Sequence, residues 1–127
     1  MINSNPVSTV EKFMACINSG DLDGALKQYE EDAIFVAEGG TVLKGQESIR
    51  IALSELVNIK AKLEAMSHEV ISNEDVALFI AKWKMSGVGP DGSSFCQEGI
   101  SADVLRRQKD NRWLISVDNP YGQEILK

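Results

Sequence analysis

The sequence predicts an α+β fold in which helices come first and an antiparallel sheet follows. Up to Asn58, apolar residues recur three and four positions apart, which is the spacing of one helix face. After Asn58, four long segments follow whose residues suit β-strands, and one of them clearly alternates apolar with charged side chains. Short connections rich in Gly, Asn and Asp separate these segments, and short connections imply antiparallel neighbours.

Three helices are expected before the long strands. Asn5 and Pro6 are typical of a helix start, with Asn as the N-cap and Pro at the first helical position. Gly20 can end this helix in the left-handed conformation, Asp21 can cap a second helix, and Gly45 precedes a third. The three apolar stripes are Val10, Phe13, Met14 and Ile17; Leu22, Ala25, Leu26 and Tyr29; and Ile49, Ala52, Leu53 and Leu56.

The expected strands form a short hairpin and a longer meander. The hairpin joins residues 33–37 to residues 41–44 through a turn that contains Glu38. The four strands of the meander are expected at residues 62–72, 76–86, 94–108 and 112–119. A twisted sheet of four long strands has a concave face that three short helices only partly fill. The uncovered part predicts a pocket lined by apolar side chains, with a small hydrophobic molecule as its ligand.

Length, charge and composition restrict the possible partners. A chain of 127 residues is long enough for one core and too short for two domains, so a single domain over residues 1–127 is expected. The net charge of −6 argues against nucleic acid as a partner, because phosphate binding requires a basic face. No apolar run approaches the roughly 18 residues of a membrane span, and the first residues lack the features of a signal peptide. A cytoplasmic protein without a membrane partner is therefore expected.

Neither a metal site nor a cofactor is expected. Cys16 and Cys96 match no metal-ligand spacing, and a single histidine, His68, excludes a multi-histidine zinc site. The glycines at 87, 89 and 92 surround a turn between strands and do not open a helix, as a phosphate-binding loop would.

The order of elements, together with several local motifs, resembles a known superfamily. These motifs are the segment 18–23 (NSGDLD), the pair 32–33 (DA), Gly45, and the pair 112–113 (RW). In that order they resemble the nuclear transport factor 2-like superfamily, and within it the SnoaL-like and ketosteroid-isomerase-like proteins of bacteria. The resemblance implies a cone-shaped fold, with three N-terminal helices packed on a strongly curved, mixed or antiparallel sheet that encloses a pocket. It also implies a homodimer.

The resemblance argues against steroid isomerase activity. Ketosteroid isomerase uses an aspartate base, with a tyrosine and a protonated aspartic acid as hydrogen-bond donors. Matching by motif places Phe13 at the tyrosine, Ala37 at the base with Glu38 one residue away, and Asp103 at the protonated acid. Only the last of these three roles keeps a suitable side chain.

Asp103 and Asp118 are the candidate catalytic residues. If Asp103 faces inward, burial makes it a potential proton donor or base; otherwise it pairs on the outer face with Arg106, Arg107 or Lys84. Asp118 either points into the pocket or bonds to its local backbone where the last strand stops. Glu98 lies five residues before Asp103 and faces the opposite side, unless the strand bulges near Gly99.

Several other side chains are expected to line the pocket, with simple core packing as the alternative. The strand at 76–86 presents one covered face, the hydroxyl of Tyr29 can reach the cavity, and Ser116 shares the parity of Asp118. The alternation along the strand that contains His68 does not decide whether this residue lies on the surface or in the cavity. Glu38 is either a solvated turn residue or a residue that acts as a gate or base at the pocket. The expected lining residues are Phe13, Tyr29, Phe79, Ala81, Trp83, Met85 and Ser116.

Three functions are consistent with the sequence. The first is a small-molecule-binding protein with an apolar pocket and no established catalysis. The second is a SnoaL-type or isomerase-type enzyme that performs acid/base chemistry on a hydrophobic carbonyl compound with Asp103 and Asp118. The third is a protein-interaction module whose cavity is filled. Leu78, Ile80 and Val104 on the outer face of the sheet add independent support for a homodimer, because exposed apolar surface usually marks an interface.

Overall fold

Three α-helices and a six-stranded sheet form the described part of the chain. The computed structural model describes residues 5–126, so the expectations about the first four residues lie outside it. In chain order the elements are α1 (Pro6–Ser19), α2 (Leu22–Leu26), β1 (Tyr29–Val36), a 3-10 turn (Glu38–Gly40), β2 (Val42–Lys44), α3 (Gln46–Asn58), β3 (Lys62–Ser72), β4 (Val76–Val88), β5 (Ser94–Arg107), β6 (Trp113–Asp118) and a second 3-10 turn (Gly122–Leu126). None of the described helices has the length and apolar character needed to cross a membrane.

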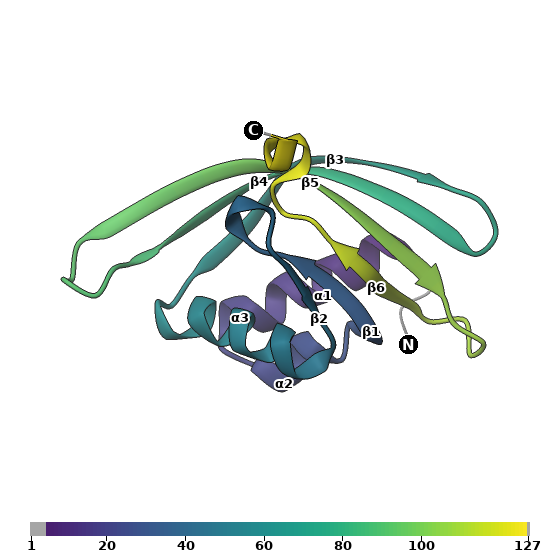
Figure 1. Ribbon diagram of the computed structural model, residues 1–127, viewed down its shortest axis with the longest axis horizontal. Coiled ribbons are helices and arrows are strands. Elements are labelled where there is room, and N and C mark those ends of the chain that lie inside the picture. The colour runs from purple at the N-terminus through teal and green to yellow at the C-terminus, as the bar shows by residue number, and fades with distance from the viewer. Residues whose placement is uncertain (1–4, 127) are drawn as a thin grey trace.

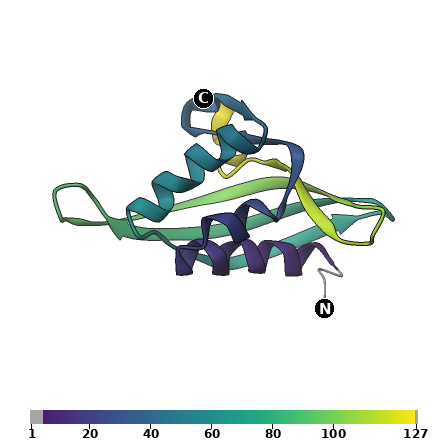
Figure 2. The ribbon, with the colours of Figure 1, turned by 90° about the horizontal axis from the view of Figure 1, so that it is seen from below.

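The sheet is mixed, with strand order β2-β1-β6-β5-β4-β3. The strands β3 to β6 pair antiparallel with their sequence neighbours, which confirms the predicted meander, and β1 pairs parallel with β6. Figures 1 and 2 show the three helices on one side of the sheet, with the long strands β3, β4 and β5 passing over them. The α+β class and the N-terminal helices packed on the sheet are thus as the sequence predicts.

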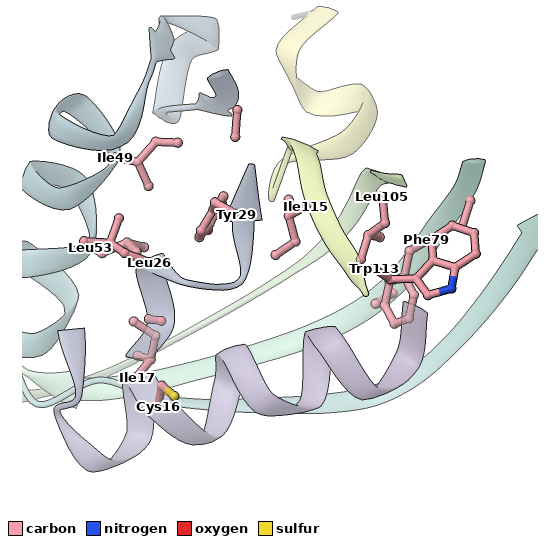
Figure 3. Packing of buried hydrophobic residues seen from close by; sticks show 14 residues of the cluster. Cys16, Ile17, Leu26, Tyr29, Ile49, Leu53, Phe79, Leu105, Trp113 and Ile115 are labelled. Carbon is pink, nitrogen blue, oxygen red and sulfur yellow. The ribbon is translucent and has the colours of Figure 1, made fainter. Parts of the chain in front are cut away.

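The hydrophobic core lies between the helices and the central strands. Leu53 of α3, Leu105 of β5 and Ile49 of α3 are fully buried. Figure 3 shows Tyr29 and Ile115 side by side in this core, and the two residues are register partners between β1 and β6. The parallel pair of β1 and β6 therefore contributes side chains to the core. In the sequence, β1 follows α2.

Tyr29 lies on a strand, and its predicted position on the second helix is wrong. The helix α2 ends at Leu26, and Tyr29 is the first residue of β1. The backbone N–H of Ile115 donates to the carbonyl of Gln28 at 2.8 Å, so pairing with β6 begins directly before Tyr29. Tyr29 continues the apolar spacing of the helix in the sequence, but pairing with β6 gives it a strand conformation. Tertiary contacts commonly override local helix propensity in this manner.

The segment 18–23 fastens α1 to the edge of the sheet. The side-chain amide of Asn18 donates to the carbonyl of Leu63 at 3.0 Å and accepts from the Leu63 N–H at 2.6 Å. Gly20 then takes a left-handed conformation with φ of 80°, where glycine costs least. Asp21 caps α2 by accepting from the Gly24 N–H at 2.9 Å. One short motif thus ends a helix, starts another and pairs with β3.

We predict that Asn18→Asp lowers the free energy of unfolding by about 1–3 kcal/mol at neutral pH, because the carboxylate cannot donate to the Leu63 carbonyl. Urea denaturation monitored by circular dichroism measures the change. Below the carboxyl pKa of ~3.9 the acid regains a donor, so the deficit should shrink there. Asn58→Asp, at an exposed position on α3, is the matched control and should change the value by no more than about 0.5 kcal/mol. Equal effects of the two substitutions would contradict the structural role of Asn18.

Candidate functional site

A hollow of about 140 Å³ lies between the helices and the sheet. Its lining is mainly apolar, and the polar side chains come from β5, β6 and the segment after β6. Met14, Phe35, Leu56 and Leu63 belong to this lining although sequence reasoning did not select them. The full lining is Val10, Phe13, Met14, Phe35, Leu56, Leu63, Ala65, Phe79, Ala81, Trp83, Met85, Gln97, Ser101, Asp103, Ile115, Asp118, Pro120 and Tyr121.

Two adjacent strands supply the wall of the hollow through regular alternation. On β4, every second side chain from Phe79 to Met85 belongs to the lining. Their register partners on β5 include Asp103 opposite Phe79 and Gln97 opposite Met85, with no irregularity between them. Since alternate residues of a strand share one face, β5 presents a row of positions 97, 99, 101 and 103 to the hollow.

The regular register settles the position of Glu98. No bulge occurs at Gly99, so Glu98 lies on the opposite face from Asp103 and is exposed. Gly99 instead leaves room for the indole ring of Trp83, because a Cβ at this position would lie 2.5 Å from Cζ2 of that ring. The indole ring therefore packs directly against β5 at Gly99. Its Nε1–H donates to the carbonyl of Pro120 at 2.8 Å, which ties this part of the wall to the segment after β6.

Asp103 and Asp118 are brought together at the buried end of the hollow. The two residues are 9% and 8% exposed, and their carboxyl groups hydrogen-bond to each other. The hydroxyl of Tyr29 donates to Asp118 Oδ2 at 2.5 Å, and the backbone N–H of Asn119 donates to Asp103 Oδ1 at 2.8 Å. The alternative outward pairing of Asp103 with Arg106, Arg107 or Lys84 does not occur, because Asp103 is buried and faces the hollow. Arg106 pairs with Glu30 and Arg107 with Asp75 instead.

The environment of this carboxyl pair raises the pKa values of both groups, and that of Asp103 most strongly. Burial raises the pKa of Asp103 well above its ordinary value, and the charge of Asp118 raises it further. Burial also raises the pKa of Asp118, but hydrogen bonds from Tyr29 and Asp103 oppose the rise. The pKa of Tyr29 is raised well above 10.0 by burial and by Asp118, so this phenol stays neutral. The pair therefore favours one retained proton shared between two carboxyl groups.

Ser116 lies outside the lining of the hollow, which corrects the expectation from strand parity. In the pairing of β5 with β6, Val104 faces Val117 while Leu105 faces Ile115, so Ser116 is an extra residue in β6. Such a bulge shifts the alternation of side chains by one position. Both Ile115 and Asp118 consequently reach the hollow, whereas the Ser116 hydroxyl bonds to Glu30.

The structure also places Tyr29, His68 and Glu38, and the latter two take the solvent-exposed position of the two that the sequence left open. Tyr29 does not line the hollow, and its hydroxyl reaches the site only through Asp118. His68 is exposed and stacks on Phe79, with ring centroids 5.3 Å apart and planes at 12°. Glu38 is an exposed turn residue whose charge acts on the nearby Tyr121, where it helps to raise the phenol pKa.

The sequence contained signals for some of the lining residues that were missed. Gln97 and Ser101 share the strand parity of Asp103, so extending the alternation along β5 would have found both. Tyr121 follows Asp118 within a Pro-containing turn, and no periodic pattern extends that far. Among residues 5–126, no group of three or more His, Cys, Asp or Glu side chains is arranged to hold a metal ion.

Known proteins with similar structures share this fold at low sequence identity. A nuclear transport factor 2-like superfamily protein from Salmonella enterica serovar Typhimurium superposes with a TM-score of 0.78 at 14% identity, covering 87% of this chain and 83% of that one. A proposed ketosteroid isomerase from Shewanella frigidimarina gives 0.75 at 19% identity, with 87% and 89% covered. A proposed dehydratase of the NTF2-like family from Streptomyces avermitilis gives 0.77 at 16% identity, with the same coverage of 87% and 89%.

At these identities the structural similarity establishes the fold alone. No curated protein matches the sequence significantly. The SnoaL-like domain family, however, matches residues 10–114, which include most of α1, the other two helices, the first five strands and the start of β6. The chain therefore belongs to the SnoaL-like domain family and has the nuclear transport factor 2-like fold.

Proposed function

We propose that this protein binds a small, largely apolar molecule in a pocket enclosed by the curved sheet and the helices. The observation that carries the proposal is the carboxyl pair of Asp103 and Asp118, buried at the end of an otherwise apolar hollow. Burying two carboxyl groups costs free energy and does not help a core to pack. Their retention at this position is explained if they contact a ligand.

The size and polarity of the hollow restrict the ligand. Its volume of about 140 Å³ is close to the ~150 Å³ of an engineered apolar cavity that binds benzene. The enclosed part therefore suits one ring or a short alkyl chain, and a steroid nucleus exceeds it. The protonated carboxyl group of the pair can donate to a carbonyl, and the ionised one can accept from a hydroxyl. A hydrophobic alcohol or carbonyl compound fits both properties.

A second copy of the chain is proposed to cover the outer face of the sheet. Leu78 and Ile80 are each 37% exposed on β4, and Ile100 on β5 is 56% exposed. These side chains lie on the face opposite to the hollow, since they alternate with lining residues. Contiguous apolar surface of this kind usually marks an interface, and the proposed homodimer would leave the pockets facing away from it.

Acid/base catalysis is the second candidate function, and the shared proton of the carboxyl pair favours it. A buried acid beside a carboxylate can give a proton to one atom of a substrate and remove a proton from another. Tyr29 and the Asn119 N–H hold the two groups in place. A hydrophobic carbonyl compound would be the substrate class. The third possibility, an interaction module with a filled cavity, is disfavoured by the open volume beside the carboxyl pair.

We predict that filling the hollow abolishes ligand binding without unfolding the protein. Ala81 is 6% exposed and lines the hollow, so the longer side chain of Ala81→Met would occupy the ligand volume. A thermal-shift screen with small hydrophobic alcohols and ketones identifies a binder for the native protein. At a hundred times its dissociation constant, such a binder should add about 2.7 kcal/mol to the free energy of unfolding.

The matched control for this substitution is Ala102→Met, because Ala102 lies on the opposite face of β5. This variant should keep the ligand-dependent shift, whereas Ala81→Met should lose it and retain a melting temperature near the native value. If both variants respond to the ligand like the native protein, the binding site lies elsewhere and the proposed pocket is wrong.

We predict that the carboxyl pair makes the fold less stable as the pH rises. The folded-state pKa values of Asp103 and Asp118 are raised, so above ~3.9 the unfolded chain ionises while the folded chain keeps a proton. The free energy of unfolding then falls with rising pH, by at most about 1.4 kcal/mol per pH unit for each retained proton. Asp103→Asn retains a donor for Asp118 and removes this contribution, so it should be more stable than the native protein at neutral pH.

Urea denaturation between pH 4 and pH 8, compared between the two proteins, isolates the effect of Asp103 from that of other carboxylates. Glu30, for example, acts in the opposite direction, since its hydrogen bonds with Arg106 and Gln108 lower its pKa despite partial burial. Glu98→Gln, an exposed change on the other face of β5, is the control and should leave the pH dependence unaltered. Parallel pH profiles for the native protein and Asp103→Asn would show that Asp103 holds no proton near neutrality.

A further inference from the structure

We propose that the ligand carries a second polar group, and that Gln97 binds this group at the open end of the hollow. The inference rests on the proposed binding function and deepens it, because it defines the class of ligand. The ligand would be an elongated molecule with a hydroxyl or carbonyl at one end, an apolar middle, and a hydrogen-bonding group at the other end.

The pairing of β4 with β5 fixes the two polar ends on one wall. Gln97 and Asp103 both line the hollow, and the register between them is regular. Asp103 lies six positions after Gln97, so their Cα atoms are about 20 Å apart along β5. Side chains that lean toward each other shorten the gap, but the two groups cannot contact the same atom of a ligand. A molecule that meets both must span the hollow.

Exposure along β4 shows which end of the hollow is closed. Phe79, opposite Asp103, is 2% exposed, and Ala81 is 6% exposed. Trp83 and Met85, farther along the same face, are half-buried, as is Gln97. The carboxyl pair therefore lies at the closed end and Gln97 at the mouth. A ligand would enter with one polar group foremost and leave the other beside Gln97.

The wall around Gly99 offers no hydrogen bond to a ligand, and the hydroxyl of the next wall residue, Ser101, donates to the carbonyl of Ala81 at 3.4 Å. Gly99 has no side chain, and the indole ring of Trp83 covers its backbone. The indole Nε1–H of Trp83 is already bonded to the Pro120 carbonyl. This apolar surface suits the hydrocarbon part of a ligand and separates the two polar ends.

The amide of Gln97 is available for a ligand. Within the described chain, residues 5–126, its side chain makes no hydrogen bond, although the amide has two donor hydrogens and an acceptor oxygen. The neighbouring wall residues are Met85 and Trp83. Neither offers the Gln97 amide a hydrogen bond, because the Nε1–H of Trp83 is already bonded to the Pro120 carbonyl. A half-buried amide among apolar side chains gains most from a polar ligand group that replaces the water it would otherwise bind.

The test compares straight-chain alcohols with the diols of the same length that carry a hydroxyl at each end, from hexane to dodecane derivatives. Isothermal titration calorimetry measures the dissociation constants for the native protein, for Gln97→Leu and for the control Glu98→Gln. The melting temperature and circular dichroism of each unliganded variant verify its fold. For the native protein, the diol of matching length should bind about five-fold more tightly than its alcohol, as expected for one additional hydrogen bond.

In Gln97→Leu the diol should lose about this five-fold advantage, while the alcohol of the same length should bind at least as tightly as before. The control Glu98→Gln should behave like the native protein. If the native protein binds alcohols and diols equally, or if the ratio is unchanged in Gln97→Leu, the role of Gln97 is wrong while the apolar pocket stands. If the native protein binds neither series, the proposed binding function itself fails, and this inference fails with it.

Discussion

The hydrogen bond between the carboxyl groups of Asp103 and Asp118 is the constraint on which the rest of the site depends. Two carboxylates cannot both ionise at contact distance in a buried environment, so one proton must stay between them. The surrounding structure stabilises that single negative charge with the hydroxyl of Tyr29, while the Asn119 N–H bonds to Asp103. Since Tyr29 begins β1, the arrangement requires the parallel pairing of β1 with β6 as well as the antiparallel pairing of β5 with β6. The strands β1, β5 and β6 thus all contribute to holding this pair of carboxyl groups.

The helices determine how much space remains beside that pair. The core packs tightly around Ile49, Leu53 and Leu105, which belong to α3 and β5 and are fully buried. Farther along β4, burial decreases from Phe79 to Met85, because the helices do not cover the full length of the strands. The same sheet therefore provides a packed core at one end and an open wall at the other. This division explains how a chain of 127 residues can hold both a stable core and a hollow.

The sequence predicted the fold class, the order of the elements and the face of β4 that lines the hollow. These features follow from local periodicity and turn chemistry, which a sequence displays directly. The carboxyl pair was predicted residue by residue, but its contact depends on which strands become neighbours and on the bulge at Ser116. A bulge leaves no periodic pattern in the sequence. Strict alternation along the last strand therefore placed Ser116 in the hollow together with Asp118, but only Asp118 lies there. Tyr29 was misplaced for a related reason, because helix spacing and strand pairing compete there and only the assembled sheet decides.

The bond between Asn18 and Leu63 has a consequence for how the molecule behaves in a crowded solution. The strand β3 is a long free edge of the sheet, and such edges are templates on which other chains can add strands and aggregate. The amide of Asn18 occupies the edge N–H and carbonyl of Leu63, and the pairing with β4 is irregular a few residues later, between Ala65 and Ser67. An edge that is capped at one end and kinked beyond it offers only short stretches for intermolecular pairing. The same motif that joins α1 to the sheet thereby removes the Leu63 end of this edge from intermolecular strand pairing.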